Sequence, residues 1–250
     1  MPDLLLRDLR DGVAFLRMNR VDKHNAFNRE LSLAVCEAID ASEADGDVRV
    51  IVLTGAGKAF CAGADMTEAL ASMDAGGRGD VMAQAVIRVA RVAKPVIGAI
   101  NGYAFGGGAA LACACDIRIA SERASFRFPG ASYGLVVGGS QLPRIVGAAR
   151  AKELIFTARV VEAEEAERIG LVNRVVPHDA LDGVTWELAR QIAEQSPPAV
   201  RWSKAVIDAA STVEKGIELE IEANRALRGS PEHVARFRAA TKRVARSEEG

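Results

Sequence analysis

Continuous apolar segments alternate along the chain with segments whose apolar residues recur three and four positions apart. Leu4–Leu9 and Val13–Met18 are predicted strands, and Asp11-Gly12 between them is a residue pair typical of a tight hairpin turn. Val48–Thr54 and Val96–Ile100 are almost entirely apolar, which predicts strands buried on both faces. Shorter strands are expected over Ile117–Ala120, Ser125–Phe128 and Leu171–Val176.

Helices are predicted between these strands. Asn28 is a predicted N-cap for a helix from Arg29 to about Ala44, and Gly106-Gly107-Gly108 opens an Ala-rich helix that runs to about Cys115. Further helices are expected over 80–93, 139–146, 149–157 and 163–169. Strands interleave with helices as far as about Val176 and only helices follow, which predicts an α/β or mixed α+β fold with a C-terminal helical region.

Composition excludes several classes of protein. The 250 residues carry 32 basic and 33 acidic side chains, and 49% of them are hydrophobic. Because the charges nearly cancel, a strong general attraction to nucleic acid or to an anionic membrane is not expected. No signal peptide and no apolar segment of about 18 residues is evident, so a cytoplasmic protein without a membrane span is expected.

Metal and dinucleotide sites are not predicted. The four cysteines and three histidines lack the clustered spacing of metal ligands, and the cysteines are expected to be reduced and mostly buried. The triple glycine at 106–108 lacks the spacing of a dinucleotide-binding loop, because its last position is Leu111.

A serine hydrolase is a remote alternative. Gly130-Ala131-Ser132-Tyr133-Gly134 matches the G-x-S-x-G pattern of a nucleophile, and Asp208 and His233 follow in the required order. That pattern needs a strand before it and a helix after it. The residues after Gly134 are typical of an extended segment instead, which disfavours Ser132 as a nucleophile.

Two segments that follow buried strands are rich in small residues, namely Phe60–Met66 and Asn101–Gly108. The first N–H groups of a helix have no partner within the helix, and the helix dipole adds positive charge there. Two such amides that converge on one carbonyl oxygen form an oxyanion hole. The alternative is that these glycines only permit tight turns from strand to helix.

These segments resemble those of the crotonase family, also called the enoyl-CoA hydratase/isomerase family. The matching stretches span nearly the whole chain in family order: Asn19–Phe27, Leu53–Met66, Lys94–Gly108, Cys115–Ala120, Gly170–Val172 and Ser230–Phe237. The resemblance implies the crotonase fold, with a spiral core of ββα units over 1–195. It also implies that the C-terminal helical region, 196–250, builds a homotrimer or a dimer of trimers.

The resemblance further implies an acyl-CoA thioester as the substrate, with no permanently bound cofactor. By motif match, the backbone N–H groups of Ala64 and Gly107 would form the oxyanion hole and stabilise a thioester enolate. The positions that would hold coenzyme A are Lys23 and Ala26 for the pantetheine and phosphates, and Ala62, Asp65 and Met66 for the adenine end. Lys23 has an alternative interpretation as a solvated lysine in a polar loop.

The chain departs from the family at its two catalytic glutamates. The first position holds Ala110 and the second, after Pro129, holds Gly130. Since neither side chain transfers protons, hydration by two carboxylates and isomerisation by a single carboxylate at the second position are both disfavoured. Nearby side chains that could replace them are His24, Glu68, Asp74, Arg127, Ser132 and Tyr133.

Each replacement has a structural alternative. Arg127 interrupts an apolar strand and could either hold a substrate carboxylate or face solvent, and Asp116 is expected to anchor a turn. Glu68 and Asp74 lie in a glycine-containing segment that is predicted to be mobile. The chain is therefore predicted to be a crotonase-family enzyme, by default an enoyl-CoA hydratase/isomerase. Other enolate chemistry, such as decarboxylation of a malonyl-type thioester, and a catalytically silent acyl-CoA-binding protein are the alternatives.

Overall fold

The computed structural model describes residues 3–75 and 82–210, together with the separate positions 217, 221, 222, 224, 226, 231 and 235. The chain divides into two units, Met1–Ile192 and Ala193–Gly250. The first unit contains both of the β-sheets described here, and the second contains α9 (Pro197–Ala209).

The larger sheet has six strands in the order β1-β2-β3-β5-β7-β10. Its members are β1 (Leu5–Arg10), β2 (Val13–Met18), β3 (Val50–Gly55), β5 (Val96–Ile100), β7 (Ile117–Ser121) and β10 (Arg174–Val176). The β1–β2 pair is antiparallel, as the Asp11-Gly12 turn predicts, and the other pairs are parallel. The strand predicted over Leu171–Val176 is shorter than expected, because only its last three residues pair with β7.

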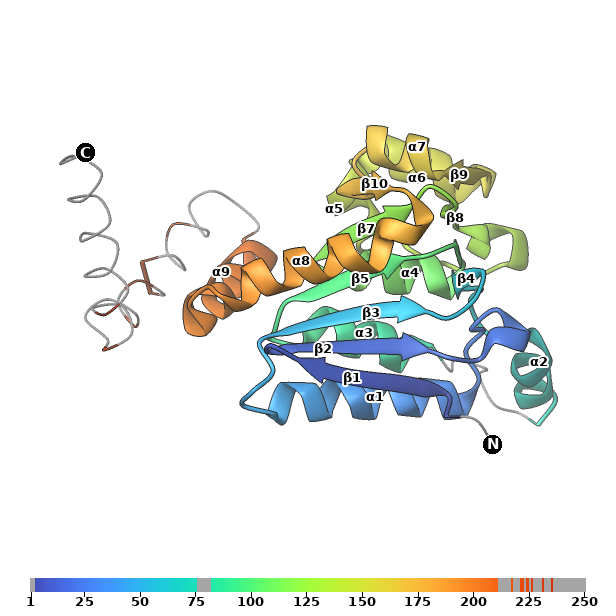
Figure 1. The fold of residues 1–250 in the computed structure, drawn as a ribbon. Helices are drawn as coiled ribbons and strands as arrows, with labels where there is room; N and C mark the ends of the chain where they lie inside the picture. Colours follow the sequence, from blue (N-terminus) through green and yellow to red (C-terminus); the bar gives the residue numbers. More distant parts are fainter. Residues whose placement is uncertain are drawn as a thin grey trace. The chain divides into compact units, whose positions relative to one another are not determined.

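Helices cover both faces of the larger sheet (Figure 1). On one side lie α1 (Arg29–Ala44), α3 (Ala83–Arg91) and α4 (Gly107–Ala114), and on the other lies α8 (Leu181–Ala193). Asn28 caps α1 as predicted, since its Oδ1 accepts the N–H of Leu31 at 3.0 Å. The main core combines inward residues of β2 and β3, such as Leu16 and Ile51, with the apolar stripe of α1.

The smaller sheet has four strands of three residues each, and the sequence did not predict it as a sheet. Its order is β4 (Ala59–Cys61), β6 (Tyr103–Phe105), β8 (Ser125–Arg127) and β9 (Val160–Glu162). The first three strands are parallel, and β9 is antiparallel to β8. Three residues are too few for an apolar alternation to be recognised in the sequence.

The remaining helices of the first unit connect these strands. They are η1 (Val21–Lys23), α2 (Met66–Asp74), η2 (Pro129–Tyr133), α5 (Leu142–Val146), α6 (Ala148–Thr157), α7 (Ala163–Arg168) and η3 (His178–Ala180). Glu68 and Asp74, in the segment predicted to be mobile, both lie in α2, which Asp65 caps through its side chain. Gly76 and Gly77 lie outside the described residues.

A repeated path through the two sheets positions the candidate site. The chain passes from β3 through β4 to α2, and again from β5 through β6 to α4. Because β4 pairs with β6, the segments that follow these two strands are neighbours in space. These are the two small-residue segments identified in the sequence.

Candidate active site

The two small-residue segments meet at Gly63 and Gly107. A Cβ atom built on Gly63 would lie 2.9 Å from the carbonyl oxygen of Phe105 and 3.5 Å from the amide nitrogen of Gly107. Gly63 has φ +103°, a conformation that side chains other than glycine rarely adopt. Glycine at 63 therefore allows the backbone of one segment to approach the first amide of α4.

The amides of Ala64 and Gly107 make no hydrogen bond to another group in the part of the chain that the structure describes. On either side of Ala64, the Gly63 carbonyl accepts from Phe27 N at 2.7 Å and Asp65 N donates to the Phe27 carbonyl at 2.8 Å. Because N–H groups alternate along an extended chain, the Ala64 amide points away from Phe27. Gly107 is the first residue of α4, so its N–H has no intrahelical partner. Two amides without partners are thus available at the meeting point of the segments.

Two buried asparagines hold the connection between β3 and β4, just before the first segment. Asn25 Nδ2 donates to the carbonyl of Ala59 at 2.8 Å, and Asn101 Nδ2 donates to the same oxygen at 3.2 Å. Asn101 also donates to the Gly57 carbonyl at 3.0 Å and accepts from Gly55 N at 3.2 Å. This role was not predictable from the sequence, because an isolated asparagine gives no indication of which distant backbone groups it binds.

The residues predicted to hold coenzyme A lie on two adjacent segments, 20–27 and 62–66. The N–H of Ala62 donates to the carbonyl of His24 at 3.0 Å, and Phe27 and Ala64 form an isolated parallel bridge. The structure therefore brings together the backbone around Lys23 and Ala26 with Ala62, Asp65 and Met66. Lys23 is exposed at the end of η1, and Met66 is 64% exposed at the start of α2.

Asp65 and Lys23 differ in their partners. The carboxylate of Asp65 forms an ion pair with Arg20 at 2.7 Å and caps α2 by accepting from Thr67 N at 3.0 Å. The hydrogen bond from Arg20 is the main cause that lowers the pKa of Asp65. The Lys23 ammonium has no ion pair or hydrogen bond within the described ranges. On the segments 20–27 and 62–66, Lys23 is therefore the cationic side chain that is available to bind an anionic ligand.

The two positions at which the family has glutamates differ in the space around them. Ala110 is partly exposed in α4. Gly130 is buried in η2, and a Cβ built there would lie 2.8 Å from the Leu135 carbonyl oxygen and 2.9 Å from Val137 N. Backbone atoms cannot move as a flexible side chain does, so position 130 has no room for a larger residue.

The side chains considered as replacements are engaged elsewhere or exposed. Arg127 Nε donates to the carbonyl of Ala158 at 2.7 Å, so its guanidinium is directed toward the connection between α6 and β9. Glu68 accepts from Arg29 N at 2.8 Å. Asp116 accepts from Val96 N at 2.7 Å and anchors a turn, as predicted.

His24, Asp74 and Tyr133, three further replacement candidates, are exposed. His24 makes an edge contact with Tyr103, with 6.2 Å between the ring centroids. Asp74 is exposed at the end of α2, and Tyr133 is 58% exposed in η2.

Ser132 does not lie at the strand-to-helix turn that a hydrolase nucleophile requires. It is exposed in the 3-10 helix η2, which ends at Gly134 in a left-handed conformation. Asp208 belongs to the second unit, and His233 lies outside the described residues. Nothing in the described part of the chain assembles a catalytic triad around Ser132.

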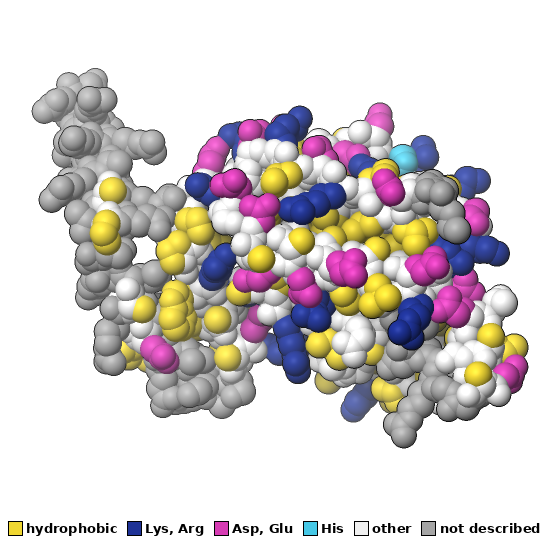
Figure 2. Space-filling view, turned by 90° about the horizontal axis from the view of Figure 1, so that it is seen from below, with side chains coloured by type: hydrophobic (Ala, Val, Ile, Leu, Met, Phe, Trp, Pro, Cys, Tyr) yellow, Lys and Arg dark blue, Asp and Glu magenta, His cyan; other side chains and the backbone are white. Residues whose placement is uncertain are grey.

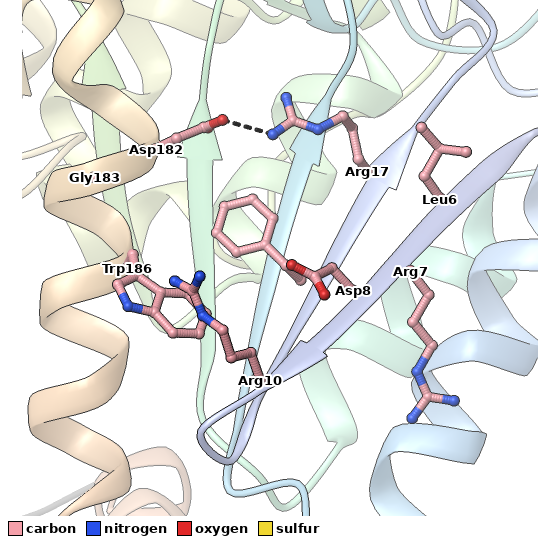
Figure 3. Close-up of a pocket in the computed structure, with 9 residues that line it drawn as sticks. Leu6, Arg7, Asp8, Arg10, Arg17, Asp182, Gly183 and Trp186 are labelled. Carbon is pink, nitrogen blue, oxygen red and sulfur yellow. Dashed lines mark hydrogen bonds and ion pairs between the residues drawn. The ribbon is translucent and has the colours of Figure 1, made fainter.

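A groove of about 510 Å³ lies elsewhere in the first unit, between α8 and the hairpin of β1 and β2 (Figure 3). The guanidinium of Arg10 lies 3.9 Å from the ring centroid of Trp186, and Arg17 pairs with Asp182 at 2.6 Å. None of the predicted site residues lines it. On the face drawn in Figure 2, basic and acidic side chains are interspersed, as the near-zero net charge predicts.

Cysteines and metal ligands do not add chemistry to the site. All four cysteines are free and buried, as predicted. Burial raises the pKa of Cys61, in β4, to about 12, so its thiol is protonated and unreactive at neutral pH. In the described part of the chain, no three His, Cys, Asp or Glu side chains are placed to bind a metal, and no helix is long and apolar enough to cross a membrane.

The sequence and the fold are similar to those of known enoyl-CoA hydratases. The enoyl-CoA hydratase/isomerase family model matches residues 8–246. The chain is 38% identical over 227 residues to the crotonyl-CoA hydratase of Syntrophomonas wolfei, covering 88% of this chain and 87% of that protein. It is 40% identical over 216 residues to the short-chain-enoyl-CoA hydratase of Clostridium acetobutylicum, covering 84% and 80% respectively. The crystal structure of the enoyl-CoA hydratase from Bacillus anthracis superposes with a TM-score of 0.91 at 32% identity, covering 96% of this chain and 97% of that one.

Proposed function

The chain belongs to the enoyl-CoA hydratase/isomerase family of enzymes and has the crotonase fold, and from this premise we propose that it binds acyl-CoA thioesters and stabilises their enolates without the usual pair of glutamates. The observation that carries this proposal is the approach of Gly63 to the amide of Gly107, where the amides of Ala64 and Gly107 have no hydrogen-bond partner among the described residues. Two N–H donors at one point are what a thioester carbonyl oxygen needs as negative charge develops on it.

The chemistry follows from where the charge goes. Removal of a substituent from the carbon next to the thioester carbonyl leaves an electron pair that moves onto the carbonyl oxygen. The N–H groups of Ala64 and Gly107 stabilise that oxyanion more than they stabilise the neutral carbonyl, so they lower the barrier rather than only tighten binding. The dipole of α4, whose first residue is Gly107, acts in the same direction.

Among the described residues, no side chain takes the place of the two glutamates of a hydratase in this proposal. Ala110 and Gly130 replace the two glutamates, and the carboxylates of Glu68 and Asp116 bind backbone amides instead. This favours reactions that need no carboxylate of the protein. In such a reaction water takes up the proton, or a group of the substrate itself is the leaving group. It also supports a second candidate, a catalytically silent acyl-CoA-binding protein, because binding needs the amides and not the carboxylates.

Coenzyme A would be held beside the hole by the segments 20–27 and 62–66. Lys23 would pair with a phosphate, and the backbone around Ala62 would face the adenine. We expect Lys23→Gln to weaken acyl-CoA binding several-fold in calorimetry, whereas Lys152→Gln, on the exposed surface of α6, leaves it unchanged. If the two variants bind acyl-CoA with equal affinity, Lys23 is a solvated lysine that does not contribute to binding. The homotrimer or dimer of trimers stays a prediction that sedimentation would test.

Three measurements on the intact protein test the function. Calorimetry should detect binding of butyryl-CoA. Exchange of the C2 protons of butyryl-CoA for deuterium should run faster with the protein than in buffer alone, and hydration of crotonyl-CoA should stay at the buffer rate. Binding without accelerated exchange would favour the silent binder, and the absence of binding would overturn both.

Variants of Ala110, in α4, test whether one added carboxylate is enough for hydration. Ala110→Glu places a carboxylate at the first of the two family positions, and Ala110→Gln places a similar side chain there without the charge. Because position 130 remains glycine, we expect neither variant to hydrate crotonyl-CoA. Hydration by the native protein at a rate typical of enzymes would show that other groups supply the acid and base.

A further inference from the structure

Cys61, the last residue of β4, has a buried thiol that binds the backbone of the first small-residue segment. Its side chain has no exposed surface, and its Sγ accepts the N–H of Gly63 at 3.4 Å. The Gly63 N–H has no other acceptor among the described residues. Sulfur is a weak acceptor, but it satisfies an amide that would otherwise be buried without a partner.

This hydrogen bond acts on the residue directly before the Ala64 amide. The Gly63 carbonyl and the Ala64 N–H belong to one planar peptide group, in which they point in opposite directions. Their direction depends on the φ and ψ of Gly63, and glycine by itself restricts neither angle strongly. Two bonds restrict them here, since Cys61 Sγ binds the Gly63 N–H and Phe27 N donates to the Gly63 carbonyl at 2.7 Å. The thiol and the Phe27 amide together direct the Ala64 N–H.

Cys61 also lies against the first turn of α4. A Cβ built on Gly108 would collide with the carbonyl oxygen of Cys61 and would lie 2.9 Å from the Cys61 Cβ. Cys61 pairs with Ala104 of β6, the strand that leads into α4. Because Gly108 follows Gly107, Cys61 contacts the backbone on both sides of the candidate oxyanion hole.

The chemistry of a thiol suits a position near a developing negative charge. Burial raises the pKa of Cys61 to about 12, so the sulfur carries no charge at neutral pH and does not oppose an oxyanion nearby. An S–H group is also a weak donor. The contact of Sγ with the Gly63 carbonyl oxygen is long, at 3.9 Å, so the Phe27 amide at 2.7 Å remains the main donor to that oxygen.

We propose that Cys61 is a positioning residue of the oxyanion hole: its thiol holds the Gly63 N–H and thereby keeps the Ala64 amide directed at the same oxygen that the Gly107 amide binds. This inference rests on the proposed binding of acyl-CoA at these two amides. A hydrogen bond weakens steeply as it departs from linear geometry, so a small rotation of the peptide between Gly63 and Ala64 would weaken one donor and leave the other in place. The thiol, which is fully buried, acts through the backbone and does not touch the substrate.

Three variants separate the hydrogen bond from the volume of the thiol. Cys61→Ala removes the acceptor, Cys61→Val fills a similar volume without an acceptor, and Cys61→Ser keeps an acceptor. Infrared difference spectra of bound butyryl-CoA, labelled with ¹³C at the thioester carbonyl, report the hydrogen bonds to that oxygen. The stretching frequency should rise in the alanine and valine variants and stay near the native value in Cys61→Ser. Loss of one oxyanion donor typically costs about 10²–10³ in rate, so C2 deuterium exchange should slow at least about tenfold in the first two variants and less than about threefold in Cys61→Ser.

The matched control is Cys115→Ala, which removes another buried thiol at the other end of α4, where Sγ donates to the Leu111 carbonyl at 3.5 Å. It should lower thermal stability but leave the frequency and the exchange rate unchanged. If Cys61→Val and Cys61→Ser give the same frequency, the thiol only fills space and the inference is wrong. If the native protein binds butyryl-CoA without accelerating exchange, the frequency alone decides. Absence of binding to the native protein would overturn the proposed function itself.

Discussion

Replacing Gly107 by proline would remove one oxyanion donor and leave the helix intact. Gly107 is the first residue of α4, the helical position at which proline is best tolerated because its missing N–H has no intrahelical partner. The residue before proline must avoid the helical region, and Gly106, with φ 56° and ψ −120°, lies outside it. Gly107→Ala is the matched control, since it adds a Cβ against Met82 but keeps the amide hydrogen.

The expected loss differs between binding and catalysis. One neutral hydrogen bond contributes about 0.5–1.5 kcal/mol, so Gly107→Pro should bind butyryl-CoA roughly two- to twelve-fold more weakly than Gly107→Ala. Stabilisation of a full oxyanion contributes more, and loss of one donor typically costs about 10²–10³ in rate. The rate of C2 deuterium exchange should therefore fall at least about tenfold further than the affinity does.

Two readings on the same samples test this expectation. Calorimetry gives the affinity, and infrared difference spectra of butyryl-CoA labelled with ¹³C at the thioester carbonyl report hydrogen bonds to that oxygen. The stretching frequency should rise in Gly107→Pro relative to Gly107→Ala. If the two variants give the same frequency and the same exchange rate, the Gly107 amide does not contact the substrate and the proposed site is wrong.

Other parts of the site give three further predictions. Asn101→Ala should destabilise the protein by about 3 kcal/mol in urea, because Gly55 N and the Gly57 carbonyl lose their bonds to Asn101 and the Ala59 carbonyl keeps only the bond from Asn25; a loss below about 1 kcal/mol would contradict this. Since Arg20 lowers the pKa of Asp65, their pair stabilises the fold fully above the ordinary carboxyl pKa of about 3.9 and is lost as the pH falls through the lowered value. Asp65→Asn should therefore show a smaller drop in the urea midpoint between about pH 6 and about pH 2 than the native protein. Ser132→Ala should leave thioester and ester turnover unchanged, and a complete loss of turnover would support the alternative of a serine hydrolase.

Elements with local signals were predicted correctly from the sequence. The Asp11-Gly12 hairpin and the Asn28 cap depend on residues next to the element they define, and both are confirmed. The three-residue strand β6 was missed because its pairing with β4 and β8, rather than its own pattern, makes it a strand. The helix α2 was missed because Met66 and Leu70 are exposed and give it no buried stripe.

The candidate site was predictable in its segments but not in its packing. The motifs around Ala64 and Gly107 identify the two segments, and the family resemblance pairs them. That Met82 fills the space beside Gly107 depends on the packing of α3 against α4. A sequence pattern cannot report this contact, because residues 82 and 107 lie far apart along the chain and Met82 alone is an ordinary apolar residue.

Gly130 constrains the order in which a carboxylate pair could evolve or be engineered in this chain. Ala110 already has a Cβ and could become glutamate in one step, whereas any side chain at 130 meets the backbone at Leu135 and Val137. The loop that contains Leu135 and Val137 would have to change its conformation first. Gly130→Glu would therefore be harmful in the present sequence and useful only after the loop has changed. Such epistasis makes two-carboxylate chemistry in this chain reachable only through several dependent steps, the first of which brings no catalytic gain.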